Sequence, residues 1–293
     1  MAREKKNNVT KAGIIRVATE KFLRTGYSGT TVKAIGEELG ISTGHITFYF
    51  PTKEHLLAIL VDMLCGFQWK MMDRGTTELS AMSLELTAMA SMCQENDIAR
   101  DFYLSAYTQP MTLDIIRRND TQRARTVFAK YCPDWTEEMF AEAEILVSGI
   151  EYATLMTTES SPSLEARISG GLNQIFSIYN VPEEVRKGLI ADVLQQDYCG
   201  IGRQIFSEFM AYIEEVNEQV LESLLTSGEL VMLTPQICLY RKDYDRILEA
   251  AKKHFEANDS LTLAQLRDML NTSRKYSSTL LPSWARMSST GRW

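Results

Sequence analysis

Residues 30–50 read TTVKAIGEELGISTGHITFYF, and this stretch decides the fold of the N-terminal region. Its first half places apolar side chains on one helical face, at Val32, Ile35 and Leu39. Gly40-Ile41-Ser42 is a short connection in which glycine supplies an unusual backbone angle and serine caps the next helix. Ile46 and Phe50 then point the same way, toward a core. The stretch therefore predicts two helices joined by a tight turn.

A further helix is predicted before this pair. Ile14, Ala18 and Phe22 recur every four residues, and Gly26 follows as a left-handed stop. Either Thr30 or Thr31 caps the second helix. Three short helices within residues 10–55 predict a helix-turn-helix domain.

The outer face of the third predicted helix carries Gly44 and Phe48, flanked by His45 and Thr47, and has no acidic residue. Because a carboxylate would repel phosphates, this composition favours entry into the major groove of DNA. Ser42 and Thr43, at the helix start, can donate hydrogen bonds to phosphate. The face is interpreted as the DNA-reading surface.

Lys53 lies in the first turn of the helix that begins after Pro51. A cation there is disfavoured by the helix dipole, so its ammonium needs a partner. A DNA phosphate is one such partner, and Tyr49 can donate its hydroxyl to a neighbouring one. The alternative is a solvated Lys53 and a Tyr49 packed at the surface.

These motifs together resemble the DNA-binding domain of TetR-type repressors, and the likeness extends more weakly over residues 1–222. It implies phosphate contacts from Thr31, Thr43, Tyr49 and Lys53, and base contacts near Gly44, His45 and Thr47. Thr47 stands where the family usually has tyrosine, so that tyrosine's phosphate contact passes to Tyr49. The whole predicted DNA-binding set is Thr30, Thr31, Lys33, Ser42, Thr43, Gly44, His45, Thr47, Phe48, Tyr49 and Lys53.

Charge is distributed unevenly along the 293 residues. The net charge is −7, but residues 1–60 carry nine basic and five acidic side chains, residues 61–225 carry twelve and twenty-six, and residues 226–293 carry ten and seven. A polyanion would be attracted to the two ends and repelled by the middle. Nucleic-acid contacts are therefore expected at the termini, unless the basic ends are simply solvated surface.

Helical periodicity dominates the acidic middle, so an all-α fold is predicted with domains at 1–55, 56–225 and 226–293. The family resemblance implies that the middle domain binds a small-molecule effector and forms a homodimer. Candidate pocket residues are the methionine and aromatic side chains Met89, Phe102, Tyr103, Tyr107, Phe128, Tyr152 and Met156. Such residues at helical spacing also form ordinary core.

Two apolar stripes are candidates for the dimer interface. One lies on a long helix over residues 200–225, and the other on residues 139–157. The first comprises Phe206, Phe209, Ile213, Val216 and Val220. The alternative is burial of these side chains within one subunit.

Residues 229–284 contain a short apolar pair of segments and a capping box, Thr262 with Gln265, at the start of a helix. They resemble the winged-helix domain of the selenocysteine-specific elongation factor SelB, which binds an RNA hairpin, although Pro282 and the chain end at Trp293 truncate the pattern. Ser273, Arg274 and Lys275 are the candidate nucleic-acid contacts. RNA binding and a structural or protein-contacting role both remain open.

Several function classes find no support in the sequence. It has no phosphate-binding loop, no dinucleotide or metalloprotease motif, three histidines and five scattered cysteines without C-x-x-C spacing. Neither an enzyme, a cofactor nor a metal site is predicted, and no apolar run is long enough for a membrane span. The expectation is a cytoplasmic DNA-binding repressor that responds to an effector; an RNA-linked protein and a pure interaction module are the rivals.

Overall fold

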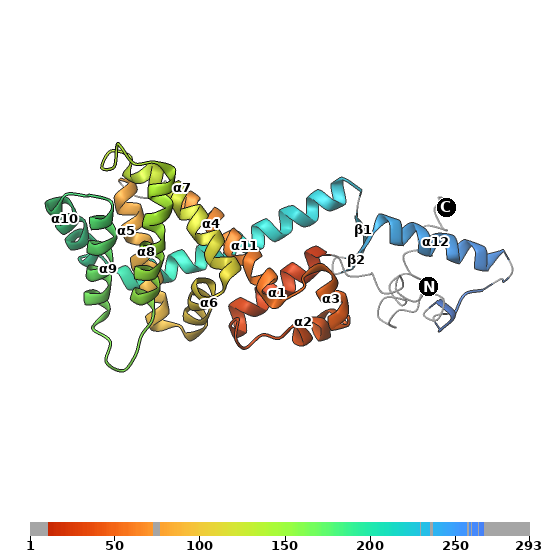
Figure 1. Ribbon diagram of the computed structural model, residues 1–293. Coiled ribbons are helices and arrows are strands. Elements are labelled where there is room, and N and C mark those ends of the chain that lie inside the picture. The colour runs from red at the N-terminus through yellow and green to blue at the C-terminus, as the bar shows by residue number, and fades with distance from the viewer. Residues whose placement is uncertain are drawn as a thin grey trace. The chain divides into compact units, whose positions relative to one another are not determined.

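The computed structural model describes residues 11–72, 77–228, 230–234, 237–256, 258, 260–262 and 264–266 (Figure 1). Its helices are α1 (Lys11–Thr25), α2 (Val32–Leu39), α3 (Thr43–Tyr49), α4 (Lys53–Met71), α5 (Glu78–Glu95), α6 (Asp97–Thr108), α7 (Pro110–Phe128), α8 (Glu137–Leu155), α9 (Leu164–Ile178), α10 (Glu183–Leu194), α11 (Tyr198–Thr226) and α12 (Arg241–Phe255). Two strands, β1 (Leu230–Thr234) and β2 (Ile237–Tyr240), separate α11 from α12. The predicted fold class, helical with a small α+β element near the C-terminus, is confirmed.

The chain divides by contacts into two units. One comprises Ala18–Thr31 and Thr52–Glu214, and the other comprises Met1–Val17, Val32–Pro51 and Glu215–Trp293. The predicted boundaries at residues 55 and 225 stay a prediction. In the described part of the chain no helix combines the length and apolarity needed to cross a membrane.

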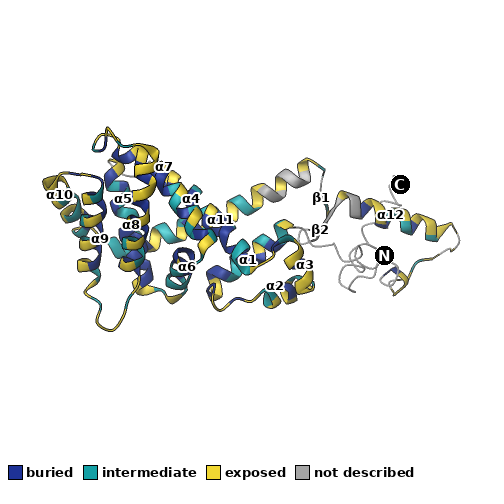
Figure 2. Ribbon diagram, in the orientation of Figure 1, coloured by how far each residue is buried: buried dark blue, intermediate teal, exposed yellow. Residues whose placement is uncertain are grey.

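The larger unit is a helical body built around α4, α5 and α7. α4 and α8 pack on α7, while α6, α9 and α10 pack on α5. One aromatic cluster lies between α7 and the end of α9, where the rings of Phe128 and Tyr179 stack with centroids 4.0 Å apart. Both rings are fully buried, and Figure 2 shows the corresponding inner faces of these helices in dark blue.

A charged network is buried in the same body. The guanidinium of Arg123 on α7 donates to both carboxylate oxygens of Glu85 on α5 and, at 3.3 Å, to Asp120. Burial raises the pKa of Asp120 to about 6 in spite of the adjacent guanidinium. Burial likewise raises the pKa of Glu144 to about 8, and this carboxyl accepts a hydrogen bond from the Tyr179 hydroxyl.

The second unit contains α2 and α3, whose inward-facing side chains Ile35 and Ile46 are buried as the sequence pattern predicts, while Val32 and Leu39 are half-buried. Ile14, Ile35 and Ile46 are fully buried. α2 and α3 pack closely at Gly36, where a Cβ atom would lie 2.7 Å from the carbonyl oxygen of Ile41. Gly40 takes the turn with φ +67°, a conformation that glycine adopts without strain. The predicted helix-turn-helix is therefore present.

The C-terminal element begins where α11 ends. β1 and β2 pair antiparallel, with an irregularity between Met232 and Thr234, and α12 packs against both strands. The predicted capping box also forms: Gln265 accepts from the Thr262 amide at 2.9 Å, and the Gln265 amide donates to the Thr262 hydroxyl at 3.2 Å. Ser273, Arg274 and Lys275 lie outside the described residues.

Candidate nucleic-acid interface and ligand cavity

α3 presents a neutral outer face to solvent. Ser42, Thr43, Gly44, Thr47 and Phe48 are all exposed. The hydroxyl of Thr47 donates to the carbonyl of Gly44 at 3.4 Å. Ser42 begins the helix, but its side chain makes no capping bond to the helix amides, so that part of the prediction was wrong. No acidic side chain belongs to this face, so it does not repel phosphates, as the sequence indicated.

Two residues of the predicted DNA-binding set are buried. His45 is 8% exposed and its ring lies edge-on against Tyr49, because the buried face of this short helix includes both His45 and Ile46. Thr30 is 1% exposed, and its hydroxyl donates to the Gly26 carbonyl at 2.7 Å. Their predicted contacts with DNA are corrected: Thr30 closes the loop after α1, and His45 packs inside.

The Lys53 ammonium forms its contacts with groups of the protein itself. Its Nζ atom donates to the carbonyl oxygens of Tyr27 at 2.8 Å and Thr30 at 3.0 Å. The same atom lies 3.9 Å from the centroid of the Tyr27 ring, and partial burial lowers the Lys53 pKa. These contacts account for the cation in the first turn of α4 without a phosphate, and a contact between Lys53 and DNA stays a prediction.

Two carboxylates extend this connection into the helical body. Asp101 on α6 accepts from the Ser28 amide at 2.8 Å, and Glu54 on α4 accepts from the Met111 amide at 2.8 Å. The Met111 amide lies in the first turn of α7, where an anion also interacts favourably with the helix dipole. The loop between α1 and α2 and the start of α4 are thus tied to α6 and α7.

The two lysines of the predicted DNA-binding set differ in role, which gives a first prediction. Lys53→Gln removes two charge-assisted hydrogen bonds and a cation–π contact, so we expect the free energy of unfolding to fall by about 1–3 kcal/mol. Lys33, whose side chain is 79% exposed and 3.7 Å from Glu37, is the matched control. Lys33→Gln should leave thermal unfolding unchanged. Equal melting temperatures for both variants would contradict the structural role of Lys53.

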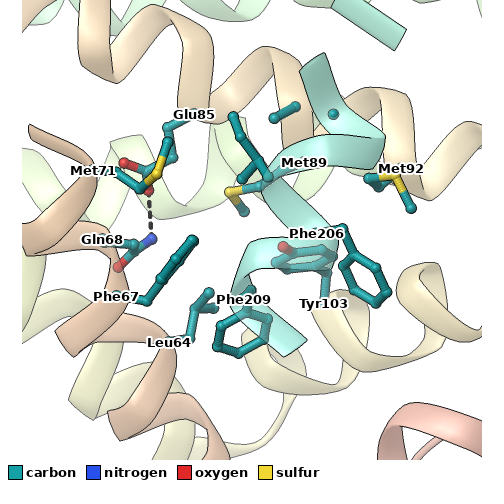
Figure 3. Close-up of a pocket in the computed structure, with 13 residues that line it drawn as sticks. Leu64, Phe67, Gln68, Met71, Glu85, Met89, Met92, Tyr103, Phe206 and Phe209 are labelled. Carbon is teal, nitrogen blue, oxygen red and sulfur yellow. Dashed lines mark hydrogen bonds between the residues drawn. The ribbon is translucent and has the colours of Figure 1, made fainter. Parts of the chain in front are cut away.

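A small cavity lies in the helical body between α4, α5, α6 and α11 (Figure 3). Its volume is about 20 Å³, room for roughly one water. The lining is mostly apolar; its polar groups include the Tyr103 hydroxyl and the side chains of Gln68 and Glu85, which are hydrogen-bonded to each other. The lining residues are Leu64, Phe67, Gln68, Met71, Glu85, Ala88, Met89, Met92, Tyr103, Gly202, Ile205, Phe206 and Phe209.

The predicted pocket residues divide between this cavity and other places. Met89 and Tyr103 line the cavity, and Phe102 is fully buried with its ring 6.2 Å from that of Phe209. Phe102 does not line the cavity, and neither do the remaining four: Tyr107 donates to Glu151 at 2.9 Å, Phe128 stacks in the aromatic cluster, Tyr152 is half-buried and Met156 is exposed. The sequence missed the α4 contribution, because α4 is apolar on nearly every side and offers no distinctive stripe.

The apolar stripe on α11 faces inward along its first half. Phe209 and Ile213 are 1% and 3% exposed within the single chain, and Phe209 packs on Phe67 of α4 with ring centroids 5.5 Å apart. Phe206 and Val216 are half-buried, while the Val220 side chain lies outside the described residues. Burial within one subunit, the alternative left open by the sequence, accounts for Phe209 and Ile213.

The helix pair α2–α3, its glycine turn and the exposed neutral face of α3 define a helix-turn-helix of the kind that binds DNA. Residues 14–60 match the family model of bacterial regulatory proteins, tetR family. Residues 253–281 match that of the winged helix of elongation factor SelB. No curated protein matches the chain. The first match supports DNA binding by a transcriptional regulator whose helix-turn-helix is similar to that of the tetR family.

Proposed function

We propose that the protein is a homodimeric repressor that binds operator DNA through α3 and releases it when a small molecule occupies the helical body. The exposed, acid-free face of α3 carries this proposal. Ser42, Thr43 and Thr47 supply hydroxyl groups for phosphates and base edges, and Lys33 supplies an exposed cation at the start of α2.

The dimer surface that we propose lies on α8 and α9. α8 exposes Met139 (41%), Ile145 (54%) and Leu146 (61%), and Met156 (43%) is exposed directly after the helix ends. Isolated exposed apolar side chains are ordinary, but a row at helical spacing is typical of a protein interface. The adjacent helix α9 packs against α8 and exposes Gly170.

Two glycines suggest that a second helix pair covers this surface in the dimer. Gly149 on α8 and Gly170 on α9 lie inside helices, and a Cβ atom on either would meet nothing within 4 Å. Glycine costs about 1 kcal/mol relative to alanine in a helix, and the packing of a single chain gives no reason for it here. Close approach of a partner backbone is such a reason, and a second copy of α8 and α9 would complete a four-helix bundle.

The dimer proposal predicts a large effect of charge on this face. Leu146→Lys should convert the dimer to a monomer and weaken operator binding at least about 100-fold, because a monomer contacts only one half-site. Met232→Lys, which changes a 49% exposed apolar side chain of β1, is the control. Sedimentation velocity measures the masses. A Leu146→Lys protein that stays dimeric would contradict the interface.

Helix α4 is the proposed connection between effector and DNA. Its first turn holds Lys53, bound to the loop before α2, and its last two turns supply Leu64, Phe67, Gln68 and Met71 to the cavity. A ligand larger than the present cavity must displace side chains of α4 or α11, and the flexible methionines around it allow this at modest cost. Movement of α4 would change the spacing between the two recognition helices of a dimer.

Binding to DNA upstream of the protein's own coding sequence tests the proposal. Specific, salt-sensitive retardation in a gel-shift titration is the expected result, since phosphate contacts release counterions. Absence of a preference over an unrelated duplex of equal length, for upstream DNA and for a random pool alike, would overturn it.

A second proposal concerns the C-terminal segment, and the match to the SelB winged helix favours it. Through Arg274 and Lys275 this segment would contact RNA. Charge-neutral substitution of both residues should weaken binding to structured RNA and leave operator binding intact. Equal RNA binding by the variant and the unaltered protein would count against this role.

A further inference from the structure

Phe48 is the most exposed large apolar side chain in the described part of the chain, at 75%. It lies on the outer face of α3, four residues after Gly44, so the two share one side of the helix. Its ring contacts Tyr49 edge-on, with centroids 5.1 Å apart, and the rest of the ring faces solvent. An exposed phenyl group on the helix proposed to enter the groove needs an apolar partner there.

α3 lacks the side chains that usually identify bases. Its sequence, Thr43–Tyr49, contains no arginine, lysine, asparagine or glutamine, the residues that make paired hydrogen bonds with guanine or adenine in the major groove. His45, the remaining ring with hydrogen-bonding nitrogens, is buried. Hydrogen-bond discrimination by α3 is therefore limited to hydroxyl groups, which accept several base edges.

Gly44 lets the helix come close to the base pairs. A Cβ atom at this position would have Ser42 Oγ, 3.9 Å away, as its nearest neighbour, so the space beside the backbone is open. Without a side chain there, Phe48 can reach the floor of the groove. The apolar group that the major groove offers is the C5 methyl of thymine.

We propose that Phe48 is a specificity-determining residue that recognises the methyl group of a thymine in each operator half-site. This inference rests on the proposed DNA binding and adds the chemical group that is read. Burial of one methyl group against the phenyl ring should change affinity by about four- to tenfold.

The experiment compares thymine with uracil, which differs by that methyl group alone. The full-length protein first selects duplexes from a random pool, and each thymine of the selected duplex is then replaced singly by uracil. We expect one replacement per half-site to weaken wild-type binding about four- to tenfold. Phe48→Ala should bind the thymine duplex more weakly and no longer distinguish uracil at that position, whereas Phe48→Leu keeps part of the preference.

The outcomes distinguish a failure of the proposed DNA binding from a failure of thymine recognition by Phe48. If no duplex is selected, the proposed DNA-binding function fails, and the inference fails with it. If a duplex is selected but uracil has no effect anywhere, or if Phe48→Ala keeps the full preference for thymine, the inference is overturned and DNA binding stands. Thermal unfolding of Phe48→Ala should match that of the unaltered protein, since the side chain is mostly in solvent.

Discussion

Replacing Arg123 by methionine should lower the free energy of unfolding by about 3–5 kcal/mol, because it leaves two carboxylates without their buried partner. Arg123 is 3% exposed and joins Glu85 on α5 to Asp120 on α7. Methionine fills similar volume, so the loss comes mainly from uncompensated charge rather than from an empty space. Denaturation by urea at pH 7.5 measures it.

The same variant should recover stability as the pH falls. Burial already raises the pKa of Asp120 to about 6, and loss of the guanidinium raises it further above the value in the unfolded chain. A group whose folded-state pKa is raised favours the folded state at low pH, and this contribution is lost as pH rises through the folded pKa. The deficit of Arg123→Met should thus be larger at pH 8 than at pH 5.5.

Arg118→Met provides the matched control on the same helix. Its side chain is 71% exposed and pairs with Asp114 at 3.2 Å, an arrangement that contributes little in water. We expect a change within about 0.5 kcal/mol. A similar loss in both variants, or a loss in Arg123→Met that does not depend on pH, would contradict a buried charge network.

Gly36→Ala should disrupt the helix-turn-helix and abolish specific DNA binding. The added Cβ would lie 2.7 Å from the Ile41 carbonyl oxygen, so α2 and α3 must move apart, at a cost of about 1–3 kcal/mol. Gly188→Ala, in the middle of α10 where nothing lies within 4 Å, should instead stabilise by about 0.5–1 kcal/mol. Operator affinity and thermal unfolding are measured for both. Wild-type affinity in Gly36→Ala would refute this packing.

The sequence predicted the helix-turn-helix well because its signals are local. Helical spacing identified Ile35 and Ile46 as core, and Gly40 marked the turn. The protein partners of Thr30 and Lys53 were missed because they are backbone carbonyls of the loop that precedes α2. Electrostatics indicated that Lys53 needs an acceptor, but the sequence does not say which oxygens the fold brings to it.

The apolar helices show a second limit of sequence reasoning. Periodicity identifies the apolar side of a helix but not the surface that covers it. Phe209 of α11 is covered by its own chain, whereas Leu146 of α8 is left exposed. In the sequence, the apolar stripes that contain these two residues have the same helical spacing. The polar end of the cavity escaped prediction for a related reason: it joins Gln68 and Glu85 from separate helices, and their pairing is a tertiary contact.

The central claim, a dimer that reads DNA through α3, is tested most directly by selecting duplexes from a random pool with the full-length protein and measuring their affinity across salt concentrations. We expect an inverted repeat with half-sites about one helical turn apart, one dimer per duplex, and log affinity that falls linearly with log salt. Selection of no sequence, or of a site bound equally well by Gly36→Ala, would contradict it.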